Sequence, residues 1–350
     1  MTRSDPVLLD VTRKLLHDVA DPQTRRGGAG RAAAWRALEA NGLTKAWVPE
    51  AAGGAGAGIA DGFAILTLAG GVALDLPLAE TLLAGWLLAA AGLAVPDGQL
   101  APAGAEGAPI TLDDGGRLHG RATAVAFARE VAQLAVLARR GSGELVVALV
   151  DRAACAVRPR DNVAGEPRDG VVLDGVAPIA HAPAAAGLGD QLVAMGATAR
   201  ACQIAGALQG ILARSVAYAG DRVAFDRPLA KFQAIQHALA RLAGETAIAI
   251  AASGSAAETL AATPDDGDAV FLEVASAKIR VGEAAAAGAA IAHQVHGAIG
   301  FSTEHPLHLF TRRLWAWRDD FGSETAWAVR LGNYVAGRGA DAVWPMLAAR

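Results

Sequence analysis

The sequence predicts a mainly α-helical protein with a β-domain in its centre, on three observations. Hydrophobic residues make up 53% of the 350 residues, many of them alanine, which favours helices. The 41 glycines are concentrated between periodic apolar runs, where glycine is typical of loops. Between residues 98 and 187 the runs are short and strand-like, whereas helical runs precede and follow them. We therefore expect three domains, spanning residues 1–97, 98–187 and 188–350.

The first domain is predicted to consist of helices separated by loops rich in glycine and proline. A glycine-rich break is expected at residues 27–30. The most apolar run, residues 81–95, is shorter than the roughly 20 residues that a membrane span needs, so we expect a buried helix and no membrane association. Apolar side chains elsewhere recur at helical spacing. They are Leu8, Leu9, Val11, Leu15, Leu16, Trp35 and Leu38.

Strand-length apolar runs characterise the second domain, and long helical runs the third. The predicted strands cover residues 109–112, 132–138, 145–150 and 170–176, with Gly, Asp and Pro turns between them. The predicted helices cover residues 188–219, 229–262, 267–298 and 321–349. Four long helices with short connections favour an antiparallel bundle.

Charge and cysteine usage exclude several classes of function. The formal net charge is −4 and no basic stripe dominates, so we expect no nucleic-acid partner. The N-terminal residues carry charges and lack the apolar core of a signal peptide. The two cysteines, Cys155 and Cys202, have no CxxC spacing, which fits a reduced, cytoplasmic protein without disulfides.

Three segments carry motifs with fixed spacing. In residues 41–58 a Gly-Leu precedes a Pro-Glu and two glycines. Residues 218–236 read YAGDRVAFDRPLAKFQAIQ, and residues 294–323 read QVHGAIGFSTEHPLHLFTRRLWAWRDDFGS. These segments resemble the motifs of the flavin-dependent acyl-CoA dehydrogenases. The matching positions of the last two segments are Arg222, Phe225, Pro228, Phe232, Gln233, Gln236, Gln294, Gly297, Gly300, Glu304, Pro306, Arg312 and Gly322.

The resemblance implies an acyl-CoA dehydrogenase-like fold, with an N-terminal helical domain, a middle β-barrel and a C-terminal four-helix bundle. It implies FAD as cofactor and an acyl-CoA thioester as substrate, which is oxidised to the trans-2-enoyl-CoA in fatty acid or steroid catabolism. Electrons would leave through an electron-transfer flavoprotein. The chain would be a subunit of a homo- or hetero-oligomer, a dimer of dimers with another acyl-CoA dehydrogenase subunit.

The resemblance also implies the residues that bind FAD. Arg222 would pair with the pyrophosphate, because a guanidinium gives charge-assisted hydrogen bonds to phosphate oxygens. Phe225 and Gln233 would contact the adenosine half. Gln294, Gly297 and Ala298 would approach the same half, Ala298 standing where the family has a second glycine. The alternatives are a solvated loop around Arg222 and a plain helix C-cap near Gly297.

Two pieces of the family pattern are missing. Phe321 stands where most of the family has its catalytic Glu, and a phenyl ring cannot take a proton. Residues 101–109, APAGAEGAP, stand where the family has a Thr-Glu-Pro and a Gly-Ser-Asp that hold the flavin ring and substrate. A minority of the family places the base on the first bundle helix, but the positions here are Gly196 and Ala197. In the family the retained residues reach a neighbour's FAD, so the losses suggest a heteromeric complex with shared FAD sites.

Other interpretations remain open. Asp320, beside Phe321, is a candidate catalytic base, because crowding with Asp319 could raise the pKa of one carboxyl. An acidic N-cap for the last helix is the favoured alternative. The chain could also be a catalytically silent scaffold subunit, or a flavin-dependent oxidase or monooxygenase on the same fold.

Two motif-like patterns are predicted to carry no site. His293, His296, His305 and His308 form two HxxH pairs, but no cysteine or carboxylate accompanies them at ligand spacing, so we expect no metal. The run GGAGAG at residues 53–58 lacks the order of a dinucleotide-binding loop and is predicted to be a turn.

Overall fold

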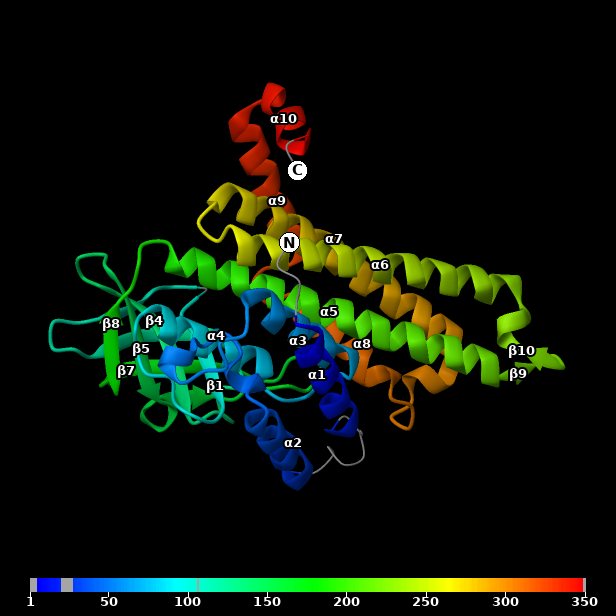
Figure 1. Cartoon of the computed structure of the whole chain (residues 1–350), viewed down its shortest axis with the longest axis horizontal. Helices are drawn as coiled ribbons and strands as arrows, with labels where there is room; N and C mark the ends of the chain where they lie inside the picture. The colour runs from blue at the N-terminus through cyan, green and yellow to red at the C-terminus, as the bar shows by residue number, and fades with distance from the viewer. Residues whose placement is uncertain (1–4, 20–27, 106, 349–350) are drawn as a thin grey trace.

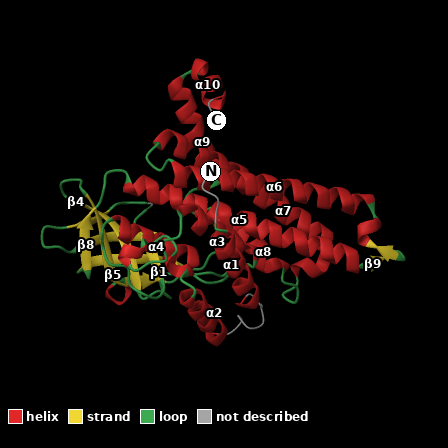
Figure 2. Cartoon of the chain, in the orientation of Figure 1, coloured by secondary structure: helices red, strands yellow, loops and turns green. Residues whose placement is uncertain are grey.

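A computed structural model of the chain describes residues 5–19, 28–105 and 107–348. It is mainly helical with one central sheet, so the predicted fold class is confirmed (Figures 1 and 2). The N-terminal helices and the sheet lie along one half of the long helix α5, and the remaining half of α5 extends away from them with α6 and α7 (Figure 1).

The N-terminal part contains α1 (Pro6–Val19), α2 (Gly28–Ala40), α3 (Ile59–Gly71) and α4 (Leu78–Ala90). The expected break at residues 27–30 is wrong, because α2 already begins at Gly28; Gly27 lies outside the described residues. The run 53–58 does form a connection, between the 3-10 turn Glu50–Ala52 and α3.

Helix α4 confirms that the most apolar run is a buried helix. Every residue from Leu78 to Gly85 is buried, as are Leu87 and Leu88. Even Glu80 and Thr81 in its first turn are buried, and Thr81 is paired with the backbone of Leu100. No helix within the described residues is both long and apolar enough to cross a membrane.

The strands β1 to β8 form one sheet in the order β6-β7-β3-β2-β4-β5-β8, and β1 pairs in parallel with β4. Four of them correspond to the predicted strands, with shifts of one or two residues at most ends. The sequence did not predict the other four, of which β3 is the longest. The bounds are β1 Leu100–Ala103, β2 Ile110–Leu112, β3 Leu118–Ala126, β4 Gln133–Arg140, β5 Leu145–Asp151, β6 Ala156–Arg158, β7 Arg168–Val176 and β8 Ala180–Pro183.

Three long helices follow the sheet: α5 (Leu188–Asp221), α6 (Gln233–Ala262) and α7 (Gly267–His296). A two-stranded hairpin, β9 (Val223–Ala224) and β10 (Arg227–Pro228), connects α5 to α6. Because of this hairpin, α6 begins later than the predicted residue 229.

The prediction of one last helix at residues 321–349 is wrong. Two helices, α9 (Glu324–Arg338) and α10 (Val343–Ala348), cover that range instead, and an unpredicted helix, α8 (Leu307–Trp317), precedes them. Helix α9 begins late because the Ser323 hydroxyl accepts the N–H of Ala326, and it ends at Gly339, which has a positive φ. Helices α9 and α10 rise away from the bundle (Figure 1).

Helices α3 and α5 cross closely because glycines line their contact. A methyl group added at Gly206 would overlap the carbonyl oxygen of Thr67, and one added at Gly70 would overlap the carbonyl oxygen of Gln203. Side chains of both helices belong to one apolar core that joins the N-terminal helices to the bundle. A second apolar core lies within the sheet.

We predict that Gly206→Ala lowers the free energy of unfolding by about 2–3 kcal/mol, because the added methyl group overpacks the α3–α5 crossing. Urea unfolding followed by circular dichroism measures the change. The matched control is Gly244→Ala, in the middle of α6, where an added methyl group meets nothing within 4 Å. That variant should be unchanged or more stable by up to about 1 kcal/mol. Equal effects of the two substitutions would contradict the close crossing.

Candidate functional site

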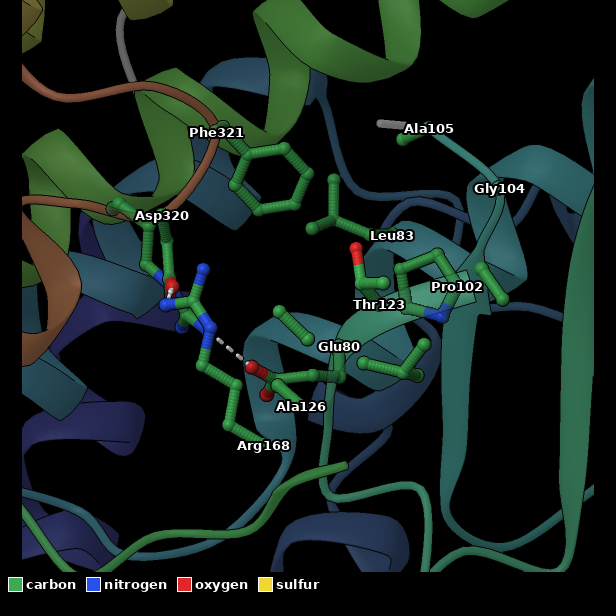
Figure 3. Close-up of a pocket in the computed structure, with 14 residues that line it drawn as sticks. Glu80, Leu83, Pro102, Gly104, Ala105, Thr123, Ala126, Arg168, Asp320 and Phe321 are labelled. Atoms are coloured by element: carbon green, nitrogen blue, oxygen red, sulfur yellow. Dashed lines mark hydrogen bonds and ion pairs between the residues drawn. The ribbon is translucent and has the colours of Figure 1, made fainter. Parts of the chain in front are cut away.

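A small pocket lies where the N-terminal helices, the sheet and the bundle meet (Figure 3). Its free volume is about 60 Å³. Residues of α4, β1, β3, β7 and α5 line it, together with the segment after β1 and the loop between α8 and α9. The lining residues are Glu80, Leu83, Pro102, Ala103, Gly104, Ala105, Thr123, Ala124, Val125, Ala126, Arg168, Arg200, Asp320 and Phe321.

The pocket brings together the two places where the family pattern is missing. Residues 102–105, from the stretch that replaces the ring-binding motif, face Phe321, which replaces the catalytic Glu. Gly196, at the alternative position of the base, lies directly beneath Phe321: a methyl group added at Gly196 would overlap the phenyl ring. Three positions separated widely in the sequence therefore surround one location, and none carries a carboxylate.

Phe321 is held in an unusual backbone conformation. Its φ is 55°, in the left-handed region that non-glycine residues rarely adopt. Gly322 follows with φ 92°, and the indole N–H of Trp327 donates to the Phe321 carbonyl at 2.8 Å. These contacts offset the backbone strain, so the ring stays over Gly196.

Buried charges occupy the polar side of the pocket. Arg200 on α5 is 4% exposed and forms ion pairs with Glu80 of α4 and with Asp320, whose Oδ2 lies 2.8 Å from the Arg200 Nε. Its third contact is the amide oxygen of Gln203 at 2.6 Å. Arg168 of β7 pairs with the other oxygen of Asp320. The charges of the pocket are thus satisfied by one another.

Asp320 is engaged in contacts with other residues of this chain. The side chain is buried, both carboxylate oxygens accept from guanidinium groups, and Lys278 of α7 donates to the Asp320 carbonyl oxygen at 2.8 Å. The favoured interpretation of an acidic N-cap is wrong for this residue, because Ser323 caps α9. Each oxygen of the Asp320 carboxylate is thus engaged by a guanidinium group, Oδ1 by Arg168 and Oδ2 by Arg200.

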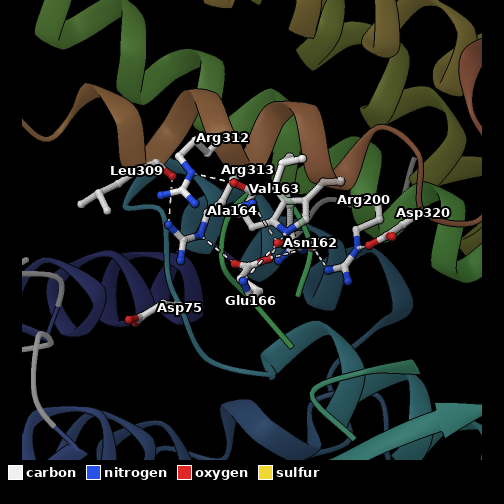
Figure 4. A network of polar contacts seen from close by, with 12 residues as sticks. Asp75, Asn162, Val163, Ala164, Glu166, Arg200, Leu309, Arg312, Arg313 and Asp320 are labelled. Carbon is white, nitrogen blue, oxygen red and sulfur yellow. Dashed lines mark hydrogen bonds and ion pairs between the residues drawn. The ribbon is translucent and has the colours of Figure 1, made fainter. Parts of the chain in front are cut away.

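A second buried network fixes α8 against the sheet (Figure 4). Glu166, in the loop before β7, pairs with Arg313 at 2.8 Å and accepts the indole N–H of Trp317 at 3.2 Å. Arg312, a position of the family motif, donates to the Val163 carbonyl oxygen at 2.6 Å. This network sets the orientation of α8, and therefore of the loop that carries Asp320 and Phe321.

The residues predicted to bind FAD lie at the opposite end of the bundle. Arg222 is the C-cap of α5 and starts the β9–β10 hairpin, where Phe225 is 88% exposed. Phe225 and Asp226 both have positive φ, so the hairpin tip projects outward. Gln233 is exposed in the first turn of α6.

The second predicted cluster, Gln294, Gly297 and Ala298, is also exposed and lies at the end of α7. Gly297, with φ 64°, is the helix C-cap, as the alternative interpretation expected. Tyr218, in the last turn of α5, stacks on His296 with ring centroids 4.6 Å apart. This contact shows that the ends of α5 and α7, and with them the two predicted clusters, lie next to each other.

The pocket and the exposed clusters are far apart. Both Gly196 and Arg222 belong to α5 and its cap, and they are separated by about 26 residues, which corresponds to roughly 39 Å of helix. The pocket therefore lies at one end of α5, and the exposed cationic and amide side chains lie at the other end. Within this chain, the pocket and the exposed clusters are too far apart to bind the same end of one cofactor.

The four histidines of the HxxH pairs do not converge on a metal position. Within the described residues no three His, Cys, Asp or Glu side chains are arranged to hold a metal ion. His293 contacts the Thr311 hydroxyl at 3.0 Å, and His296 contacts the Ala292 carbonyl oxygen at 2.8 Å.

The sequence did not identify Arg200, Glu80, Arg168 or Lys278 as residues of the pocket. A signal was present for Arg200, because it is the one charged residue between Asp190 and Arg214. A lone charge within a long uncharged helix predicts a buried partner, since an unpaired buried charge is costly. Nothing local indicates which carboxylates are the partners.

We predict that Asp320→Asn lowers the free energy of unfolding by about 3–5 kcal/mol, because it removes the negative charge that Arg168 and Arg200 share in a buried network. The control is the neighbouring Asp319→Asn, which removes an exposed carboxylate and should change stability by less than about 0.5 kcal/mol. Thermal and urea unfolding of both variants measure the difference. Similar stability of the two would show that the Arg168–Asp320–Arg200 contacts contribute little.

Comparisons with known proteins find the same family that the sequence motifs resemble. The family model described as acyl-CoA dehydrogenase, C-terminal domain, matches residues 190–318. The acyl-CoA dehydrogenase IpdE2 of Mycobacterium tuberculosis is 30% identical over 283 residues, which cover 80% of this chain and 79% of that protein. The acyl-CoA dehydrogenase FadE34 of the same organism is 31% identical over 316 residues, but this match covers only 42% of its length.

Solved structures show the same fold over nearly the whole chain. The ChsE4-ChsE5 complex from Mycobacterium tuberculosis contains a chain with a TM-score of 0.87 and 24% identity, and 97% of this chain and 99% of that chain are covered. A steroid ACAD, Tcur3481-Tcur3483, gives a TM-score of 0.84 and 25% identity, with 95% and 97% covered. The motifs, the fold and the identity to IpdE2 over most of both chains establish that this chain belongs to the acyl-CoA dehydrogenase family.

Proposed function

We propose that this chain is a subunit of a heteromeric, FAD-dependent acyl-CoA dehydrogenase and shares the FAD sites of a complete partner subunit. The partner binds the flavin ring and the acyl-CoA and carries the catalytic base. This chain provides the half-site for the adenosine and pyrophosphate end of the partner's cofactor. The observation that carries the proposal is the separation of the two regions: the chain's own pocket is filled, whereas the exposed half-site is directed outward.

The residues of the pocket do not fit a flavin ring and an acyl chain. Ligand pockets commonly have volumes of about 300–1,000 Å³, whereas this pocket has about 60 Å³. Buried ion pairs of Arg168 and Arg200 cross its polar side, and Phe321 packs against Gly196 on the other. Opening the pocket would expose or separate buried charges, which is costly.

The exposed end of the bundle does fit the phosphate end of FAD. Arg222 is exposed and forms no ion pair with any residue that the structure describes, so its guanidinium is available for phosphate oxygens. Gly297 has no side chain and leaves open space at its Cα, which allows a ligand to approach the backbone. Gln233 and Gln294 add exposed amide groups on the neighbouring helix ends.

FAD bound in the proposed complex would supply the hydride acceptor for the β-hydrogen of the acyl thioester, and the partner's carboxylate would remove the α-proton. The role of this chain is to bind and orient the distal end of the cofactor with Arg222, Gln233 and Gln294. The resemblance to the steroid ACAD Tcur3481-Tcur3483 over most of this chain supports a bulky acyl-CoA, such as one with a steroid side chain, as the substrate of the proposed complex. Electrons would pass to an electron-transfer flavoprotein.

We predict that Arg222→Ala weakens FAD binding by the co-purified complex roughly 10- to 100-fold, because one charge-assisted contact to phosphate is lost. The test measures the FAD released and rebound by the complex of this chain with its acyl-CoA dehydrogenase-type partner. The control is Arg241→Ala, which removes an exposed arginine on α6. The complex with this variant should bind FAD normally. Unchanged binding by the Arg222 variant would contradict the shared site.

A second prediction distinguishes the partner's base from Asp320. Replacing the partner's catalytic Glu by Gln should abolish the bleaching of flavin absorbance by acyl-CoA. Asp320→Asn in this chain should leave the bleaching rate per folded complex within about twofold, since Asp320 is proposed to have no proton-transfer role. The rates are measured by stopped flow at a temperature where both complexes remain folded. Loss of bleaching in the Asp320 variant alone would instead assign the base to this chain.

A further inference from the structure

The two segments of the half-site are joined beneath the surface by three aromatic rings. Tyr218 stacks on His296 with centroids 4.6 Å apart and planes 24° apart. His305 lies 4.7 Å from His296 and 6.2 Å from Tyr218, between ring centroids. We refer to these three residues as the ring cluster.

The members of the ring cluster come from three places along the chain, two of them next to half-site residues. Tyr218 is in the last turn of α5, and its carbonyl oxygen accepts the N–H of Arg222 at 2.9 Å. His296 is the last residue of α7 and directly precedes Gly297. His305 lies between the 3-10 turn Gly297–Phe301 and α8. The spacing between Arg222 and the backbone at Gly297 is therefore set through the contacts of these rings.

The contacts of His296 define its protonation state. The ring is 3% exposed, and Nδ1 lies 2.8 Å from the Ala292 carbonyl oxygen. A carbonyl oxygen only accepts hydrogen bonds, so Nδ1 carries a hydrogen. Nε2 is buried and has no hydrogen-bond partner among the described residues. In the neutral ring it is an unused acceptor; a proton added there would have no acceptor of its own.

We propose that His296 in its neutral form is a positioning residue, which holds the two segments of the half-site at the spacing that FAD requires, and that protonation of the ring cluster loosens them. The consequence for FAD rests on the function proposed above. The positioning itself depends only on contacts within this chain.

Basic groups from three helices surround the ring cluster and disfavour positive charge on it. Arg214 faces it from α5, His293 from the preceding turn of α7, and His308 from the start of α8. No carboxylate forms an ion pair with these histidines in the described parts of the chain. Burial lowers the pKa of His296, and burial followed by the charges of His296, Arg214 and His308 lowers the pKa of His305.

These shifts define the direction of the pH dependence. The folded pKa of His296 is below the ordinary value of 6.5, which an opened or unfolded segment would restore. Above pH 6.5 both states are neutral and the packing is fully stable. As the pH falls below 6.5, the opened state binds the proton first, so the stability of the half-site decreases.

The test is amide hydrogen exchange of the full chain, measured by mass spectrometry and corrected for intrinsic exchange rates. It is carried out at about pH 7.5 and about pH 5.5, which lie on either side of the ordinary histidine pKa. His296→Ala should raise exchange at least about tenfold in both residues 218–228 and residues 297–305. His296→Phe keeps an aromatic ring and should retain slow exchange, with a smaller increase at low pH. His237→Ala, an exposed histidine on α6, should behave as the unmodified chain.

Two results would overturn the inference. Faster exchange of the His296→Ala variant in residues 297–305 alone, with residues 218–228 unchanged, would show that the ring does not connect the segments. If exchange of the His296→Phe variant increased at low pH as much as that of the unmodified chain, His296 would not be the source of the pH dependence.

A second measurement separates this inference from the proposed function. In the complex with the partner, His296→Ala should weaken FAD binding roughly tenfold, alongside Arg222→Ala as the reference. A normal affinity of the His296 variant, when Arg222→Ala weakens binding, would show that the half-site does not need the ring cluster. If Arg222→Ala itself has no effect, the proposed function fails, and the exchange experiment alone decides whether His296 positions the segments.

Discussion

Arg200 carries a charge into the centre of the molecule, where it must be paired, and this requirement determines how three parts of the chain pack. Its partners are Glu80 of the N-terminal helix α4 and Asp320 of the loop after α8. An unpaired charge at this depth would cost several kcal/mol, so each carboxylate fixes the element that carries it. Arg168 adds the sheet to the same network through Asp320. On the proposed function, the ion pairs that stabilise the junction also occupy the space that a flavin ring and substrate would need.

The filled pocket and the exposed half-site follow from the same helix. Helix α5 passes through the junction near Arg200 and ends at Arg222, so a rigid element separates the two regions. At one end Phe321 packs over Gly196, where the resemblance places a carboxylate, and the other end keeps its exposed motif residues. This division is the one expected of the proposed subunit, which would contribute binding residues to a site on another chain.

The extent to which the sequence predicted the structure differs between its parts. The buried strands β4 and β5 are continuous apolar runs and were predicted from the sequence, whereas β3 contains Gly120 and Arg121 and has too irregular a pattern to be recognised. Helix α8 was not predicted, although its buried residues Leu307, Phe310, Leu314 and Trp317 recur at helical spacing. The N-cap at Ser323 makes the helix that follows begin later than predicted. The exposed candidate residues follow from fixed motif spacing. The partners of Arg200 are 120 residues away along the chain, and no local pattern contains that pairing.

The visible absorption spectrum of this chain, purified alone with added FAD and then with a complete acyl-CoA dehydrogenase partner, tests the central claim most directly. The chain alone should retain no flavin after desalting, because its own pocket is filled. The complex should show a flavin band that acyl-CoA bleaches. A chain that alone retains flavin and bleaches it with acyl-CoA would contradict the shared site and would show that the pocket opens around Arg200 and Phe321.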